Sequence, residues 1–254
     1  MIHSFLLIGQ SNMAGRGHKE EVEPIPNDNI YVLRNGRWLP MYVPVNPDRV
    51  TAGINLSESF AYAYLQDHPG VQVGLIPCAD GGTSIGQWLP GDVLFDHAVM
   101  TAKLAQRSSK IAGILWHQGE SDCADEKRAL YADRFREMAS RLREELGLQD
   151  VPMLVGGLGD FLANFVGPTG SRIAADNYTK VNDILKSLAE EDPRMGFVNA
   201  EGLTGNADNI HFSAKGLREF GLRYYEAFKK LNPETWETPV QEGPGVTLTE
   251  IEKL

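Results

Sequence analysis

Residues 5–15 read Phe5-Leu6-Leu7-Ile8-Gly9-Gln10-Ser11-Asn12-Met13-Ala14-Gly15. Four large apolar residues in succession are typical of a strand that is buried on both faces of a sheet. A glycine and small polar residues follow at once, so the strand ends near Gly9 and a serine stands just after it. Because side chains at the carboxyl ends of strands in an open α/β sheet project into the crevice where ligands bind, we expect Ser11 to face that crevice.

Further apolar runs follow along the chain, and amphipathic segments separate them. The runs predict core strands at 3–9, 71–76, 111–116, 152–156 and 195–199. The amphipathic segments predict helices at 57–67, 92–107, 126–146, 173–190 and 213–231. Strands that alternate with helices in this way predict an α/β fold with a central parallel five-stranded sheet covered on both faces.

Local signals refine this division of the chain. Ser57 and Ser213 stand where helix N-caps are expected, and Gly147 stands where the helix 126–146 should end. The Asn-Gly pair at 35–36 predicts a hairpin, which we expect beside the crevice. After Leu231 the composition shifts to proline, glycine and acidic residues, so we expect one domain over 1–231 and a surface arm over 232–254.

Composition and charge exclude several classes of function. The net charge of −10 opposes binding to nucleic acid or to anionic lipid. The first apolar run is too short to span a membrane and lacks a basic flank, so we expect no signal peptide and a cytoplasmic location. Cys78 and Cys123 make neither a disulfide framework nor a metal-ligand cluster, and we expect reduced, packed thiols. We also expect no cofactor. Nothing in the sequence indicates an oligomeric state.

A second polar segment near the end of the chain supplies partners for Ser11. Asp208-Asn209-Ile210-His211 places a carboxylate and an imidazole three residues apart, close enough for one turn to let Asp208 orient His211. A serine hydroxyl is a weak nucleophile until a base accepts its proton. Ser11, His211 and Asp208 are therefore predicted as nucleophile, base and orienting acid of an acyl-transfer reaction.

Acyl transfer also needs hydrogen-bond donors for the oxyanion that develops on the carbonyl oxygen. Gly81 and Gly82 follow the second core strand, and paired glycines let a backbone N–H approach a substrate closely. Gln118 follows the third core strand and carries a side-chain amide. With the Ser11 N–H, these groups predict an oxyanion hole of three donors: Ser11, one of the two glycines, and Gln118.

Other residues near these segments have both a functional and a structural interpretation. Glu120 either rivals Asp208 as the partner of His211 or holds the nucleophile loop, and we favour the second because a carboxylate would oppose a developing oxyanion. Trp88 offers an aromatic face to a sugar and Arg16 a cation to substrate oxygens, although both could be scaffold. His117 is more simply structural.

Four sequence blocks together resemble a known family. Residues 9–15, Gly81-Gly82-Thr83, Gln118-Gly119-Glu120 and Asp208-x-x-His211 are similar to the blocks of the SGNH-type hydrolases, in the group of sialate O-acetylesterases and of the acetylxylan esterase-related carbohydrate esterase family 6. The wider superfamily has asparagine in the third block where this chain has Gln118. The resemblance spans about residues 3–231. It implies a flavodoxin-like three-layer α/β/α sandwich and no metal, and it assigns Gly82 and Gln118 as oxyanion donors, with Gly81 as the alternative to Gly82. We also expect Gln10 either to support the site or to bind substrate.

The activity that this resemblance implies is removal of O-acetyl groups from carbohydrates, such as acetylated xylo-oligosaccharides or sialic acid, through an acetyl-enzyme intermediate. The expected partner is therefore a small-molecule or oligosaccharide acetyl ester. Two alternatives stay open. One is an esterase or thioesterase acting on small acyl substrates outside carbohydrate metabolism, and the other is an inactive carbohydrate-binding module on the same scaffold.

Overall fold

The structure is a computed structural model that describes residues 1–26 and 28–231, and it is built around one seven-stranded sheet. The strands, in the order in which they lie side by side, are β3 (Arg37–Pro40), β2 (Ile30–Arg34), β4 (Gln72–Pro77), β1 (Ile2–Gly9), β5 (Ser109–His117), β6 (Met153–Gly156) and β7 (Met195–Val198). All neighbouring strands run parallel except β2 and β3, which are antiparallel. The five predicted core strands are all present in the sheet.

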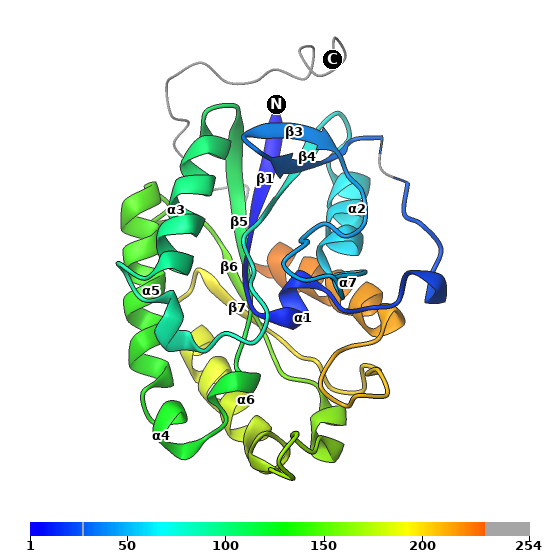
Figure 1. Cartoon of the computed structure of the whole chain (residues 1–254). Helices are drawn as coiled ribbons and strands as arrows, with labels where there is room; N and C mark the ends of the chain where they lie inside the picture. The colour runs from blue at the N-terminus through cyan, green and yellow to red at the C-terminus, as the bar shows by residue number, and fades with distance from the viewer. Residues whose placement is uncertain (27, 232–254) are drawn as a thin grey trace.

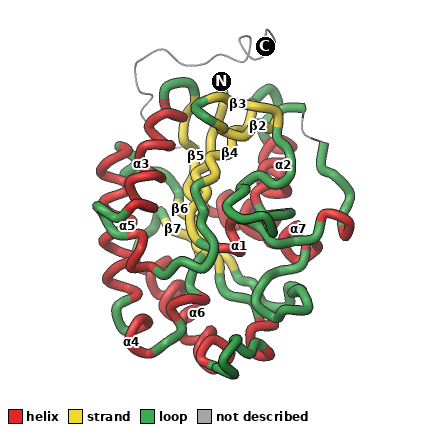
Figure 2. Tube along the Cα trace, in the orientation of Figure 1, coloured by secondary structure: helices red, strands yellow, loops and turns green. Residues whose placement is uncertain are grey.

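Helices cover both faces of this sheet, so the fold has three layers (Figures 1 and 2). The core on one face is built largely from α3 (Val93–Gln106), α5 (Tyr131–Leu146) and α6 (Ile173–Glu191), and the core on the other from α2 (Ser57–Asp67) and α7 (Ala214–Lys230). The apolar run of β1 serves both cores: Leu6 and Ile8 point to the first, Phe5 and Leu7 to the second. A strand with apolar residues on both faces therefore lies in the middle of the sheet.

Strand order explains where a ligand crevice forms. Taken alone, the five predicted strands lie in the order 2-1-3-4-5, which is the flavodoxin-like order. β1 lies between β4 and β5, so the chain leaves β1 toward one side of the sheet and later crosses to the other. Ligands bind outside the carboxyl ends of strands at such a switch point. The predicted flavodoxin-like fold class is confirmed, and Ser11 stands at its switch point.

Several local predictions differ from the structure. The predicted sheet of five strands is too small, because the 30–40 hairpin pairs with β4 and extends the sheet at its edge. The predicted helix 126–146 is two helices, α4 (Asp125–Arg128) and α5. Ser57 is the first residue of α2 and not its N-cap. Gly147 does end α5 in a left-handed conformation, and Ser213 does cap α7 by accepting a hydrogen bond from Gly216 N.

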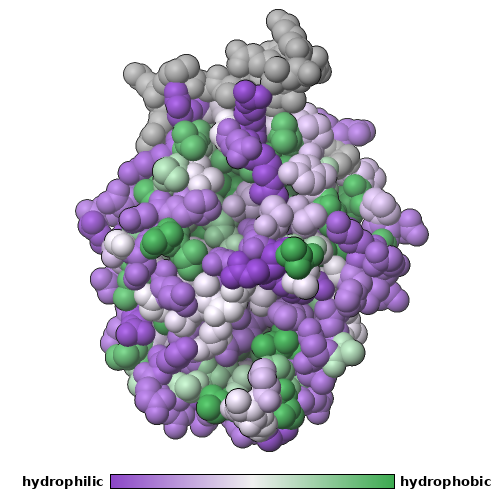
Figure 3. All heavy atoms as spheres, in the orientation of Figure 1, coloured by the Kyte–Doolittle hydropathy of each residue, from purple (hydrophilic) through white to green (hydrophobic). Residues whose placement is uncertain are grey.

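The surface of the described part is mainly polar. Hydrophobic residues form small separate groups among hydrophilic ones on the face that Figure 3 shows. Within residues 1–26 and 28–231, none of the helices has the length and apolar character needed to cross a bilayer. The surface arm predicted over 232–254 lies outside the described residues, and the cytoplasmic location stays a prediction.

Candidate active site

A tight turn between β1 and a short helix presents Ser11. Gly9 has a φ of +132°, and a side chain there would collide with the His117 carbonyl oxygen. This close approach lets Gln10 N donate to His117 O at 2.9 Å, which ties the turn to the end of β5. Ser11 then begins α1 (Ser11–Ala14) and is 6% exposed. The hydroxyl is thus held at the carboxyl end of the central strand by backbone contacts.

The loop before α7 brings His211 and Asp208 to Ser11. His211 Nε2 lies 3.0 Å from Ser11 Oγ, and His211 Nδ1 lies 2.7 Å from Asp208 Oδ2. Asp208 Oδ1 accepts hydrogen bonds from the backbone N–H groups of Ile210 and His211, each at 3.0 Å. Residues 200 positions apart in the chain therefore form one continuous hydrogen-bonded row.

The charge state of Asp208 suits an orienting role. Burial, the largest influence on this carboxyl, raises its pKa, but the hydrogen bonds from Ile210 and His211 outweigh burial and leave the pKa below its usual value. A carboxylate that is ionised at neutral pH accepts the Nδ1–H of His211 and leaves Nε2 unprotonated toward Ser11. In this arrangement Nε2 can accept the proton of the Ser11 hydroxyl.

The glycine pair after β4 lies beside Ser11, and the two glycines have different surroundings. Gly81 N donates to Asp48 Oδ2 at 2.8 Å, so its N–H is already used. Gly82 is exposed, has a φ of +79°, and has open space where a side chain would stand. Of the two glycines, Gly82 is therefore the one whose N–H is not held by Asp48.

Asp48 also explains the position of Arg16. The Arg16 guanidinium makes two hydrogen bonds to the Asp48 carboxylate, at 3.0 and 2.6 Å, and a third to Gly15 O. This ion pair is almost completely buried. Arg16 thus fixes the carboxylate that holds Gly81. Because the Arg16 side chain is buried in this ion pair, it does not offer the predicted direct contact with substrate.

Gln118 is fully buried at the end of β5, and its side-chain nitrogen is surrounded by acceptors. Nε2 donates to Thr83 O at 2.9 Å, to Gln10 Oε1 at 3.1 Å, and to Asp122 Oδ2. An amide nitrogen has only two N–H bonds. Those bonds already have protein acceptors, so donation to an oxyanion would require Gln118 to exchange one of them.

Trp88, predicted as a possible surface for sugar, lies in the core. It is 1% exposed, its ring packs edge-on against Trp116 at 5.6 Å, and its Nε1 donates to Thr83 Oγ1 at 3.1 Å. A ring enclosed in this way has no free face for a carbohydrate. The scaffold interpretation of Trp88 therefore agrees with its position, and the sugar-binding interpretation does not.

Glu120 does not contact His211. Its Oε1 accepts a hydrogen bond from Asn12 Nδ2 and lies 3.8 Å from His117 Nδ1. His117 is fully buried and its Nε2 lies 3.1 Å from Gly157 O. Burial lowers the pKa of His117, which keeps its ring neutral beneath the site. Glu120 and His117 thus belong to a group of buried residues beneath the site, here called the supporting layer, whereas Asp208 contacts His211.

Four polar residues that the sequence interpretation gave no role belong to this supporting layer. Asn46 accepts from Ala79 N and donates to Ala79 O, both at 2.9 Å, which fixes the glycine loop. Asp122 accepts from Ile85 N at 2.9 Å. Asn12 and Asp48 make the contacts given above. Asn and Asp are common in any loop, and the backbone partners of Asn46, Asp48 and Asp122 lie 33 to 37 positions away in the sequence.

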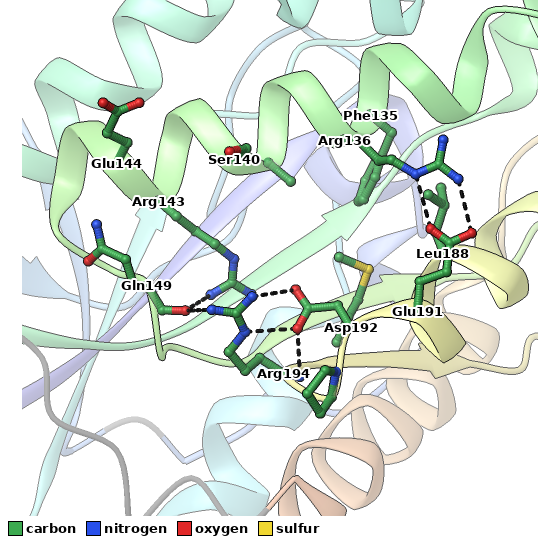
Figure 4. Close-up of a pocket in the computed structure, with 13 residues that line it drawn as sticks. Phe135, Arg136, Ser140, Arg143, Glu144, Gln149, Leu188, Glu191, Asp192 and Arg194 are labelled. Carbon is green, nitrogen blue, oxygen red and sulfur yellow. Dashed lines mark hydrogen bonds and ion pairs between the residues drawn. The ribbon is translucent and has the colours of Figure 1, made fainter.

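A separate cavity of about 500 Å³ lies between α5, α6 and the start of β7 (Figure 4). None of the predicted site residues lines it. Its Arg143 donates to Leu148 O at 2.9 Å, just beyond the end of α5, and its Arg194 and Asp192 pair with each other. These charged groups lie near the end of α5 and just before β7, away from Ser11.

The cysteines and possible metal ligands give no second chemistry in the described residues. Cys78 and Cys123 are free and buried, and burial raises the pKa of each thiol to about 12. Within 1–26 and 28–231 there is no group of three or more His, Cys, Asp or Glu side chains placed to hold a metal ion.

Comparisons with known proteins concern the family and the fold of the chain. A family model described as carbohydrate esterase, sialic acid-specific acetylesterase, matches residues 1–230. A protein of Arabidopsis thaliana described as a probable carbohydrate esterase is 28% identical over 246 residues, which are 88% of this chain and 89% of that protein. A solved Arabidopsis thaliana structure has a TM-score of 0.77 at 28% identity and covers 90% of this chain and 98% of its own.

More distant solved structures share the fold. NanS has a TM-score of 0.74 at 17% identity, with 92% of this chain and 98% of that chain covered. A carbohydrate acetylesterase from Xanthomonas citri has a TM-score of 0.65 at 20% identity, with 90% of this chain and 56% of that chain covered.

Proposed function

The chain belongs to the carbohydrate esterase family of sialic acid-specific acetylesterases and is an enzyme that hydrolyses carboxylic esters, and from this premise we propose that it removes O-acetyl groups from carbohydrates by serine catalysis. The row Ser11, His211 and Asp208 is the observation that supports this mechanism, with 3.0 Å between the hydroxyl and imidazole and 2.7 Å between the imidazole and carboxylate. These are the contacts that activate a serine nucleophile.

Acylation would begin with Ser11 Oγ attacking the carbonyl carbon of the acetyl ester while His211 Nε2 takes the hydroxyl proton. The ester C–O bond then breaks, and His211 returns that proton to the oxygen of the departing sugar hydroxyl. Deacylation repeats the sequence with water as nucleophile: His211 takes a proton from water, acetate leaves, and Ser11 Oγ recovers its proton. Asp208 accepts the Nδ1–H throughout and stabilises the imidazolium that forms twice per turnover.

The oxyanion would be stabilised by the backbone N–H groups of Ser11 and Gly82. Ser11 is the first residue of α1, so its N–H has no acceptor within that helix. Gly82 N–H is left available because Asp48 holds its neighbour Gly81 instead. For Gln118 we propose a change from the predicted donor role: by holding Thr83 O, it fixes the loop that carries Gly82.

Acetylated sialic acid is favoured over acetylated xylo-oligosaccharide as substrate, because the family description that matches nearly the whole chain names sialic acid. The test is acetate release from O-acetylated sialic acids, acetylated xylo-oligosaccharides, p-nitrophenyl acetate and an acetyl thioester, with wild-type protein and Ser11→Ala. We expect acetate release from an acetylated sugar and loss of nearly all turnover in Ser11→Ala.

Each other result of this panel contradicts part of the proposal. Acetate release from the simple ester or thioester, but from none of the acetylated sugars, would contradict a carbohydrate substrate. Binding of acetylated sugar without acetate release would identify a carbohydrate-binding module. Unchanged turnover by a folded Ser11→Ala protein would contradict the serine mechanism.

A further inference from the structure

Asn12, the residue after the proposed nucleophile, contacts the backbone on both sides of His211. Its Oδ1 accepts the Phe212 N–H at 3.0 Å, and its Nδ2 donates to Ile210 O at 3.0 Å. Asn12 is 1% exposed, so water does not compete for these hydrogen bonds. One side-chain amide therefore joins the start of α1 to residues 210 and 212 of the loop before α7.

Glu120 fixes the orientation of this amide. The second N–H of Asn12 Nδ2 donates to Glu120 Oε1, on the short 3₁₀ helix Glu120–Asp122 that follows β5. A hydrogen bond to a carboxylate is stronger than one to a neutral acceptor. With Nδ2 directed to the carboxylate and to Ile210 O, the amide oxygen faces Phe212 N. Three segments that are distant in the sequence thus meet at one buried side chain.

Asp208 and Asn12 restrain the His211 loop in different ways. Asp208 binds the ring and the N–H groups of Ile210 and His211, which are contacts inside the loop itself. Asn12 supplies hydrogen bonds from this loop to α1, which also carries Ser11. Since a misplacement of about 1 Å between reacting groups can cost about 10²-fold in rate, the distance between Ser11 Oγ and His211 Nε2 depends on such a link.

We propose that Asn12, oriented by Glu120, is a positioning residue that sets the separation and alignment of His211 relative to Ser11. This role rests on the proposed serine mechanism and deepens it. Asn12 touches neither the hydroxyl nor the imidazole in the proposed reaction, and it acts through the backbone of Ile210 and Phe212. Its loss should therefore lower kcat and leave KM nearly unchanged.

The experiment compares kcat, KM and the rate of fluorophosphonate labelling in four variants. Asn12→Ala removes all three hydrogen bonds and should lower both kcat and the labelling rate by about 10²-fold, with KM within about threefold of wild type. Asn12→Asp places a carboxylate against Glu120 and should be at least as impaired. In the double variant Asn12→Asp/Glu120→Gln, the side chain at 120 donates to the one at 12, and the Phe212 N–H keeps its acceptor. Its kcat should be at least about tenfold higher than that of Asn12→Asp.

Asn182→Ala is the matched control. Asn182 also bridges a backbone N–H and C=O, those of Leu158, at 2.7 and 3.0 Å, but it contacts neither Ser11 nor the loop 208–212. It should lower the melting temperature and leave kcat unchanged. All variants are compared at a temperature where circular dichroism shows them folded, and if Asn12→Ala does not fold, Asn12→Asp and the double variant carry the comparison.

The outcomes separate this proposal from the proposed function. If Ser11→Ala is inactive but Asn12→Ala keeps wild-type kcat, only the positioning role is wrong. Equal losses of kcat in Asn12→Ala and Asn182→Ala would show a general structural effect and overturn the proposal, as would failure of Glu120→Gln to improve Asn12→Asp. Turnover retained by Ser11→Ala would instead contradict the serine mechanism itself.

Discussion

Replacing Asp208 with asparagine should reverse the tautomer of His211 with little change in shape. An asparagine side-chain oxygen can still accept the N–H groups of Ile210 and His211 that Oδ1 accepts now. The amide nitrogen, however, would stand where Oδ2 meets His211 Nδ1 at 2.7 Å, and it can only donate. His211 would then carry its proton on Nε2, facing Ser11, and could not accept the hydroxyl proton.

The size of the effect follows from the exposure of the carboxylate. Loss of a buried orienting carboxylate lowers kcat by about 10⁴ in serine proteases, or about 5.5 kcal/mol at 1.36 kcal/mol per tenfold. The Asp208 side chain is 47% exposed, so water screens it and offers the ring alternative partners. We therefore expect Asp208→Asn to lower kcat by about 10² to 10⁴.

Steady-state kinetics on the best acetyl ester, with circular dichroism as the check on folding, measures this loss. Asp208→Ala should be less impaired in kcat than Asp208→Asn, because water at Nδ1 permits either tautomer, but less stable, because two backbone N–H groups lose their acceptor. Asp160→Asn is the matched control, since Asp160, the first residue of the short 3₁₀ helix Asp160–Asn164, is a carboxylate that accepts Gly202 N at 2.9 Å. A folded Asp208→Asn protein with kcat within about threefold of wild type would refute the orienting role.

Three further predictions concern buried residues. Trp88→Ala should cost about 3–5 kcal/mol in free energy of unfolding, measured with urea, because it opens a cavity in the core, and a loss below about 1 kcal/mol would contradict its burial. Cys78 and Cys123 should react with Ellman's reagent only after unfolding, because both thiols are buried with pKa values of about 12, and rapid reaction of the native protein would contradict this. Because the pKa of His117 is lowered in the folded protein, the unfolded chain binds more protons than the folded one below the ordinary histidine pKa of about 6.5. Stability should therefore fall as pH falls through that value, and the free energy of unfolding of His117→Gln should fall less steeply between about pH 7.5 and 5.5. Parallel pH profiles of the two proteins would contradict this prediction.

The sequence was sufficient to predict the central part of the fold because its signal is local. Each core strand is a short apolar run, and β1 shows that it is central by carrying apolar residues on both faces. The hairpin was also visible from its Asn-Gly turn. The place of the hairpin in the sheet was not visible. Pairing of β2 with β4 joins residues more than 40 positions apart and depends on β4 being the edge of the five predicted strands.

The same distinction explains the candidate site. The serine, histidine and aspartate stand in motif blocks, and the structure brings them together, while their catalytic roles stay predictions. For Trp88 and Arg16 the sequence left substrate contact and scaffold as alternatives, and each is buried by a partner that the local sequence does not reveal: Trp116 for the first and Asp48 for the second. Gln118 likewise meets Thr83 only once β4 and β5 lie on either side of β1.

Labelling with a fluorophosphonate, followed by peptide mapping, tests whether Ser11 is the nucleophile, because this reagent reacts covalently with an activated serine hydroxyl. We predict one labelled peptide, with the label on Ser11, loss of acetate release in proportion to labelling, and no labelling of Ser11→Ala. Label on a different serine, or acetate release that continues after Ser11 is fully labelled, would contradict it.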